Sequence, residues 1–138
     1  MLETNEVEYL LVGGYAVGYH GYPRPTGDID FWVGRSDSNA LKIVKVLVEF
    51  GFNSPDLSPA LFLQEKSIVR MGIAPFKLEI ITYIDGVGFA DCYPDRIETE
   101  IDDCRVKVID FEHLLINKKA SARPKDINDL IELEKIRR

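Results

Sequence analysis

The sequence predicts a fold of the α/β or α+β class, in which strands and helices alternate along a single domain spanning residues 1–138. Short apolar runs rich in β-branched and aromatic residues recur between turns that contain glycine or proline, which is the pattern of β-strands. An amphipathic stretch at 37–50 has the period of a helix. With 138 residues, of which 46% are hydrophobic and 29% charged, the chain has the size and composition of one globular domain.

The first predicted elements lie on either side of a pair of glycines. Residues 7–12 are almost all apolar and predict a strand, which Gly13 and Gly14 end because glycine lets the backbone turn without a Cβ penalty. A short helix is expected at 15–20, and a second strand at Asp28–Val33. Free N–H groups at the start of that helix would face whatever approaches the glycines, and phosphate groups commonly bind at such positions.

The stretch at 37–50 is the clearest helical segment. Ser36 or Asp37 can cap its N-terminus, and Gly51 can end it. We expect its apolar face to pack against the core and to consist of Leu41, Val44, Leu47 and Val48.

The second half of the chain continues the alternation. Asp110 can cap one helix, and Pro124 suits the first turn of a last helix. That last helix carries Ile127, Leu130, Ile131 and Leu133. We expect strands at 68–69, 76–84, 97–101 and 105–109, a helical turn at 89–93, and a helix at 111–122.

Asp28 and Asp30 are the candidate catalytic residues. Side chains alternate along a strand, so both carboxylates lie on one face, where they repel one another unless a cation such as Mg²⁺ or Mn²⁺ sits between them. An Asp-x-Asp alone is usually a solvated strand edge, and a Gly-Gly pair alone is usually a turn. Together, with Arg24 and Thr26 just before the acids, they predict a phosphate-binding turn beside a metal site. Divalent-metal-assisted transfer of a nucleotide requires that arrangement.

Glu79 is the third carboxylate of interest because it lies within an apolar strand. A glutamate there often belongs to a solvated sheet face or pairs with a nearby base, here Lys77 or Arg70. If its strand lies beside the one that carries the two aspartates, three carboxylates could bind two cations about 4 Å apart. Glu79 could also help to deprotonate an acceptor hydroxyl.

One basic cluster stands out in an acidic chain, and it comprises Lys118, Lys119, Arg123 and Lys125. Lys119 is assigned to favourable charge at a helix C-terminus. Lys118 and Arg123 are candidates for binding triphosphate oxygens.

Several other classes are disfavoured by composition. No apolar run approaches the roughly 20 residues that a membrane helix needs, and the first residues do not form a secretory leader, so we expect a cytoplasmic protein without membrane contact. Cys92 and Cys104 lack metal-ligand spacing and are expected to be reduced thiols. His20 and His113 are expected to make structural hydrogen bonds. The net charge of −6 argues against broad nonspecific binding of nucleic acid.

These motifs resemble those of a known family. The segment YLLVGGYAVGYHGYPRPTGDID at 9–30 is similar to the signature of small bacterial nucleotidyltransferases of the DNA polymerase β-like superfamily, in particular the minimal, abortive-infection-type and aminoglycoside/lincosamide-type branches. GIAPFKLEIIT at 72–82 resembles the strand that bears the third acid, and LLINKKASARPKDINDL at 114–130 resembles the closing helices. The resemblance therefore covers nearly the whole chain.

The resemblance implies a mixed β-sheet flanked by helices, with Gly13 and Gly14 facing the nucleotide phosphates. It also implies that Asp28, Asp30 and Glu79 bind Mg²⁺ (or Mn²⁺), although relatives commonly have aspartate as the third acid. The implied reaction is in-line attack by an acceptor hydroxyl on the α-phosphorus of a nucleoside triphosphate, with release of pyrophosphate. Catalysis would come mainly from positioning and charge neutralisation.

The acceptor in such a reaction could be a small molecule, the end of a tRNA or a protein side chain, and the sequence selects none of them. A separate acceptor-binding domain is not recognisable in the chain. We therefore hypothesise that a second copy of the chain, in a homodimer, or a partner protein completes the acceptor site.

Three other classes fit parts of the pattern. A nucleotide-binding or toxin–antitoxin partner module of the same fold would bind nucleotide with little turnover. A glycosyltransferase also uses Asp-x-Asp to hold a metal–nucleotide, but such domains are usually larger. In an aspartyl phosphatase the nucleophile usually ends a strand, whereas Asp28 begins one, and Trp32 stands where threonine or valine is expected.

Overall fold

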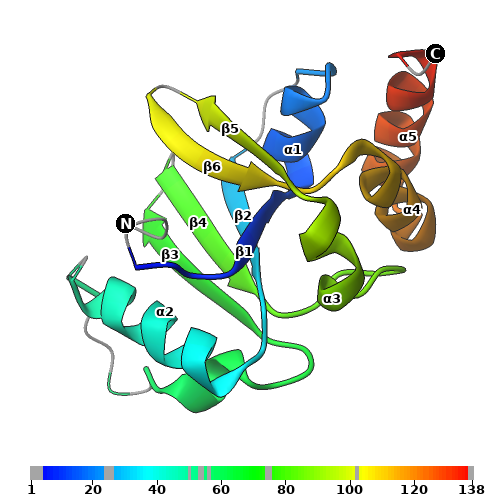
Figure 1. The fold of residues 1–138 in the computed structure, drawn as a ribbon. Coiled ribbons are helices and arrows are strands. Elements are labelled where there is room, and N and C mark those ends of the chain that lie inside the picture. The colour runs from blue at the N-terminus through cyan, green and yellow to red at the C-terminus, as the bar shows by residue number, and fades with distance from the viewer. Residues whose placement is uncertain are drawn as a thin grey trace.

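A six-stranded β-sheet forms the centre of the protein (Figure 1). The computed structural model describes residues 5–23, 27–49, 51–52, 55, 57–73, 76–101 and 103–136. The spatial order of the strands is β3-β4-β2-β1-β6-β5. Their bounds are β1 (Tyr9–Val12), β2 (Asp28–Val33), β3 (Ile68–Ile73), β4 (Phe76–Ile81), β5 (Ile97–Ile101) and β6 (Cys104–Val108).

The strand pairing is both parallel and antiparallel. β1 lies antiparallel to β2 and parallel to β6. β2 is parallel to β4 in a register that places Asp30 beside Glu79. The β3–β4 and β5–β6 pairs are antiparallel. The expected mixed sheet is therefore confirmed, and the fold class is α+β.

Helices cover both faces of this sheet. The part of the chain that the structure describes contains α1 (Gly13–Tyr19), α2 (Asp37–Glu49), α3 (Phe89–Cys92), α4 (Phe111–Ser121) and α5 (Pro124–Ile136), with short 3₁₀ turns at Pro59–Phe62 and Tyr93–Asp95. Figure 1 shows α2 on one side of the sheet and α1, α4 and α5 grouped on the other.

Two buried clusters correspond to these two layers. Trp32 belongs to the cluster that contains Leu114 of α4 and Leu133 of α5, whereas its neighbour Val33 belongs to the cluster that contains Ile43 of α2. Successive side chains on a strand point to opposite faces of a sheet. Asp30, two residues before Trp32, therefore lies on the face that α1, α4 and α5 cover.

The helix ends follow local signals in the sequence. The Ser36 hydroxyl accepts a hydrogen bond from the Asn39 backbone N–H at 3.1 Å, and the Asp110 carboxylate accepts one from the His113 N–H at 3.2 Å. Both caps agree with the sequence-based expectation. Beyond α2, Gly51 has a φ of +92°, which glycine adopts without strain.

The expected apolar face of α2 is confirmed for Leu47, which is buried, and for Val44, which packs partly buried against the cluster that contains Ile43, but it is wrong for Leu41 and Val48. Leu41 is 61% exposed and Val48 is 48% exposed, while Ala40 and Ile43 are fully buried. Both stripes have the helical period, so periodicity alone does not choose between them. The helix rotation is fixed by the buried Asn39 side chain, whose amide accepts from the Glu8 N–H at 2.7 Å and donates to the Glu8 carbonyl at 3.0 Å and the Gly34 carbonyl at 2.8 Å.

Other differences concern element ends. The strand expected at 68–69 extends to 73, the strand expected at 76–84 ends at 81, and the helix expected at 15–20 begins at 13. Within the described residues, no helix has both the length and the apolar character needed to cross a membrane. Cys92 and Cys104 are free thiols, as expected.

Candidate active site

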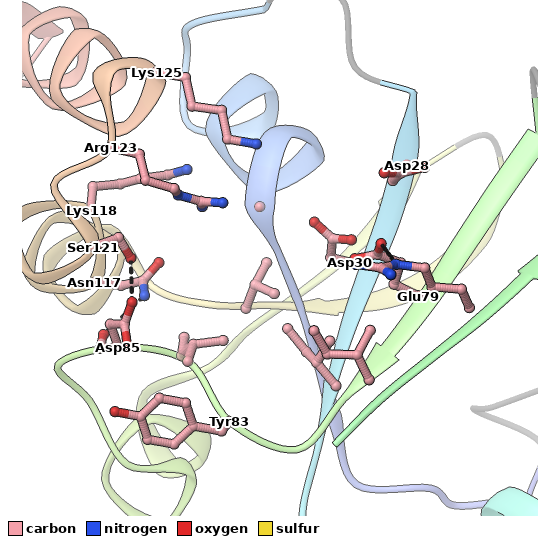
Figure 2. Close-up of a pocket in the computed structure, with 16 residues that line it drawn as sticks. Asp28, Asp30, Glu79, Tyr83, Asp85, Asn117, Lys118, Ser121, Arg123 and Lys125 are labelled. Atoms are coloured by element: carbon pink, nitrogen blue, oxygen red, sulfur yellow. Dashed lines mark hydrogen bonds and ion pairs between the residues drawn. The ribbon is translucent and has the colours of Figure 1, made fainter. Parts of the chain in front are cut away.

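A cleft of about 500 Å³ opens between the sheet and the α4–α5 pair. Figure 2 shows the acidic side chains of β2 and β4 on one wall, with polar and basic side chains of α4 and the start of α5 facing them. The acidic wall carries Asp28, Asp30 and Glu79, and the opposite wall carries Asn117, Lys118, Ser121, Arg123 and Lys125. The structure thus brings together residues that are up to 97 positions apart in the sequence.

The three acids come together because of strand pairing. Asp28 and Asp30 alternate with the apolar Ile29 and therefore share one face of β2. Glu79 is the register partner of Asp30 on the parallel strand β4. Arg70, on the outer strand β3, is in turn the register partner of Glu79, and its Nε donates to Glu79 Oε1 at 2.8 Å. Of Lys77 and Arg70, the two basic partners considered for Glu79, it is Arg70 that binds Glu79 in the structure.

The carboxyl group of Asp30 is strongly perturbed by its surroundings. Burial, together with hydrogen bonding to Glu79 and repulsion by Glu79 and Asp28, raises the pKa of Asp30 from its usual 3.8 to about 7, while Lys125 acts in the opposite direction. Its Oδ1 atom is buried and has no hydrogen-bond partner among the described residues. An unpaired buried carboxylate oxygen beside two other acids favours the binding of a cation.

Glycine is required at position 13, directly after β1, for two reasons. Its φ of +70° is a conformation that residues with a Cβ rarely adopt, and a Cβ there would collide with the Asp30 carboxylate. Gly13 lines the cleft. Gly14 is buried in the first turn of α1 and is absent from the lining of the cleft.

Lys118 lines the cleft, but its ammonium group is held by α5. Its Nζ lies 3.0 Å from Asp126 Oδ1 and 3.2 Å from Asp129 Oδ2, and all three side chains are almost completely buried. Arg123 also binds Asp126, through its Nε at 2.6 Å, although the Arg123 side chain is 61% exposed. Burial alone would raise the pKa of Asp126, but hydrogen bonds from Arg123 and Lys118 outweigh it, and this pKa lies below its usual value.

The sequence did not single out several residues that line the cleft. Tyr83 and Asp85 belong to the loop after β4, and α4 fixes that loop through two contacts: Asn117 donates to the Asp85 carbonyl at 2.9 Å, and the Ser121 hydroxyl donates to the Asp85 carboxylate at 3.2 Å. Asn117 and Ser121 are one helical turn apart, which is the only sequence signal that groups them. Arg24 and Thr26, two of the expected phosphate-binding residues, lie outside the described residues.

The donor set of the cleft fits a divalent cation that also binds substrate. Within the described residues, no group of three or more His, Cys, Asp or Glu side chains is arranged to hold a metal ion by itself. Mg²⁺, however, is usually bound by one or two carboxylates together with substrate phosphates and water. Asp28 and Asp30 supply such a pair of carboxylates. The Oδ1 atom of Asp30, which has no hydrogen-bond partner among the described residues, is available as a metal ligand.

Comparison with known proteins supports the fold. No protein-family model matches the chain, and no curated protein matches it significantly. Among solved structures, a protein of Thermotoga maritima described as a "putative nucleotidyltransferase" superposes with a TM-score of 0.58, at 18% sequence identity, over 98% of this chain and 84% of that one. The protein therefore has a nucleotidyltransferase-like fold.

Proposed function

We propose that this protein is a metal-dependent nucleotidyltransferase, which moves a nucleoside monophosphate from a nucleoside triphosphate to a hydroxyl acceptor and releases pyrophosphate. The observation that carries the proposal is the environment of Asp30: a partly buried carboxyl group, flanked by Asp28 and Glu79, that faces cationic side chains across the cleft. A site with negative charge on one wall and positive charge on the other suits a metal–triphosphate. The nucleotidyltransferase-like fold supports the same class.

Each wall has a distinct role in this proposal. Asp28 and Asp30, with Glu79, would hold Mg²⁺ or Mn²⁺, which when bound would neutralise the phosphate charge that develops during transfer. Arg123 and Lys125 would bind the outer phosphates, and Gly13 would let the triphosphate approach the acids because it has no side chain. Glu79 would take the proton of the acceptor hydroxyl.

A second candidate is a nucleotide-binding or toxin–antitoxin partner module that has the fold but little turnover. One observation favours it: Glu79 is bonded to Arg70, and in the described part of the chain no group of three or more His, Cys, Asp or Glu side chains is arranged to hold a metal ion. This candidate predicts tight binding of NTP·Mg²⁺ without release of pyrophosphate in the presence of any acceptor, whether small molecule, tRNA or protein.

The proposal is tested by isothermal titration of ATP, GTP, CTP and UTP, with and without Mg²⁺. The wild type should bind at least one of them in a Mg²⁺-dependent way, and the double variant Asp28→Ala/Asp30→Ala should not. A matched control is Glu98→Ala/Glu100→Ala, which removes two acids with the same spacing from the exposed strand β5. Absence of nucleotide binding by folded wild type, shown by circular dichroism, would contradict the proposal.

A further inference from the structure

Three charged side chains stand in one row across the sheet. Arg70 of β3 is opposite Glu79 of β4, and Glu79 is beside Asp30 of β2. Register partners on neighbouring strands point to the same face, so this row runs from the outer edge of the sheet into the cleft. Arg70, Glu79 and Asp30 all line the cleft.

Arg70 is the ion-pair partner of Glu79 on the acidic wall of the cleft. The Glu79 side chain is only 18% exposed and lies among two further carboxylates, Asp28 and Asp30. Among the described residues, Arg70 is the only basic side chain that forms an ion pair with Glu79. Without this guanidinium, Glu79 would lie beside Asp30 with no ion-pair partner among the described residues, which is unfavourable in a partly buried site.

The Arg70–Glu79 ion pair also has the exposure and geometry of a contact that can break. The Arg70 side chain is 73% exposed, and its ion pair with Glu79 is a single contact from Nε rather than the two parallel bonds of a full guanidinium–carboxylate fork. Solvent and salt reach the exposed guanidinium of this pair and weaken its attraction to Glu79. β3 is the outer strand of the sheet, and among the described residues no further strand pairs with its outer edge.

We propose that Arg70 is a positioning residue that acts as an internal counter-cation: it holds Glu79 while the cleft contains no metal, and it yields Glu79 when a divalent cation enters. The released guanidinium then pairs with an anionic group of the substrate at the mouth of the cleft. This inference rests on the proposed function, because it requires that the acids bind a metal.

The test is a titration of Mn²⁺ into nucleotide-free protein, with free Mn²⁺ measured by electron paramagnetic resonance. In Arg70→Gln, Glu79 no longer has to give up a guanidinium partner before it binds Mn²⁺. Mn²⁺ should therefore bind this variant roughly two- to five-fold more tightly than the wild type, which is the range expected for the loss of one solvent-accessible ion pair. ATP·Mn²⁺ should bind Arg70→Gln more weakly than it binds the wild type, because the anionic substrate loses a partner. Arg70→Lys, which keeps the charge but cannot keep the Nε contact, should shift Mn²⁺ affinity in the same direction by less, and it carries the test if Arg70→Gln does not fold.

The matched control is Arg105→Gln. Arg105 is 65% exposed and pairs with Glu98 on the other edge of the sheet, so its removal changes the net charge equally without touching the cleft. Arg105→Gln should leave the affinities for Mn²⁺ and for ATP·Mn²⁺ unchanged. Unchanged or weaker Mn²⁺ binding in Arg70→Gln would overturn the inference while leaving the proposed function intact, provided that the wild type binds ATP·Mn²⁺. Failure of the folded wild type to bind either Mn²⁺ or nucleotide would overturn both.

Discussion

Gly13 and Asp30 are packed so closely that a Cβ on Gly13 would overlap the Asp30 carboxylate. Gly13 directly follows β1 as the first residue of α1, and Asp30 lies in the middle of β2, the antiparallel neighbour of β1. The turn after the first strand and the acid of the second strand are therefore one unit. A substitution at either residue should therefore alter the packing around the other.

Gly13→Ala should impair both stability and binding. Alanine at a positive φ costs about 1–2 kcal/mol, and the collision with Asp30 should bring the total loss in free energy of unfolding to about 3 kcal/mol or more. Gly51→Ala is the matched control, because Gly51 also has a positive φ but its Cβ would meet nothing within 4 Å. Urea denaturation measures both variants. Equal losses would show that the Asp30 contact has no energetic consequence.

Asp30 should make the metal-free protein less stable as the pH rises. Its pKa is about 7 in the folded protein and near 3.8 when unfolded, so between these values the folded state binds the proton more tightly and protonation favours folding. The destabilisation therefore begins above pH 4 and is complete above about pH 7. In EDTA, Asp30→Asn should raise Tm relative to the wild type more at pH 8 than at pH 5.

Two comparisons make this measurement specific to the cleft. Glu100→Gln, which neutralises an exposed acid on β5, should show no such pH-dependent gain. Added Mg²⁺ should raise the Tm of the wild type at pH 8 but not that of Asp30→Asn, because the metal and the amide relieve the same repulsion. A Tm difference between wild type and Asp30→Asn that does not change with pH would show that the Asp30 pKa is ordinary.

Sequence reasoning succeeded where the signal is local. The bounds of β2, the cap at Asp110 and the proximity of Gly13 to Asp30 all follow from short-range patterns: alternation, a capping side chain and a glycine that turns the chain. The placement of Glu79 beside Asp30 was proposed on the condition that their strands are neighbours, and the structure meets that condition.

It was less informative where a partner is distant in the sequence. The rotation of α2 depends on the hydrogen bonds of Asn39 to Glu8, 31 residues earlier. Lys118 is a phosphate-binding candidate in the sequence, and only the packing of α4 on α5 reveals that two aspartates hold its ammonium group. Arg70 could be assigned to Glu79 only through the register of β3 on β4.

Lys118→Met should destabilise the protein strongly. It would leave Asp126 and Asp129 buried without their shared ammonium partner, and removal of one partner from a buried ion pair typically costs about 3–5 kcal/mol. Lys119→Met, at the exposed neighbouring position of the same helix, should change the free energy of unfolding little. Chemical denaturation of the two variants tests this. A small loss for Lys118→Met would return Lys118 to the candidates for direct triphosphate binding.

Lys125→Gln should weaken nucleotide binding with little effect on stability. Lys125 is exposed and lines the cleft, and its charge acts to lower the pKa of Asp30. Losing one hydrogen-bonding cation should reduce the affinity for NTP·Mg²⁺ about five- to ten-fold. Added salt should make the difference in affinity between Lys125→Gln and the wild type smaller, because salt screens exposed charge. Lys119→Gln removes an equal charge from the same region but outside the cleft lining, and should bind as the wild type does. If both lysine variants lose affinity equally in calorimetric titrations, the effect comes from overall charge, and Lys125 has no specific contact with the phosphates.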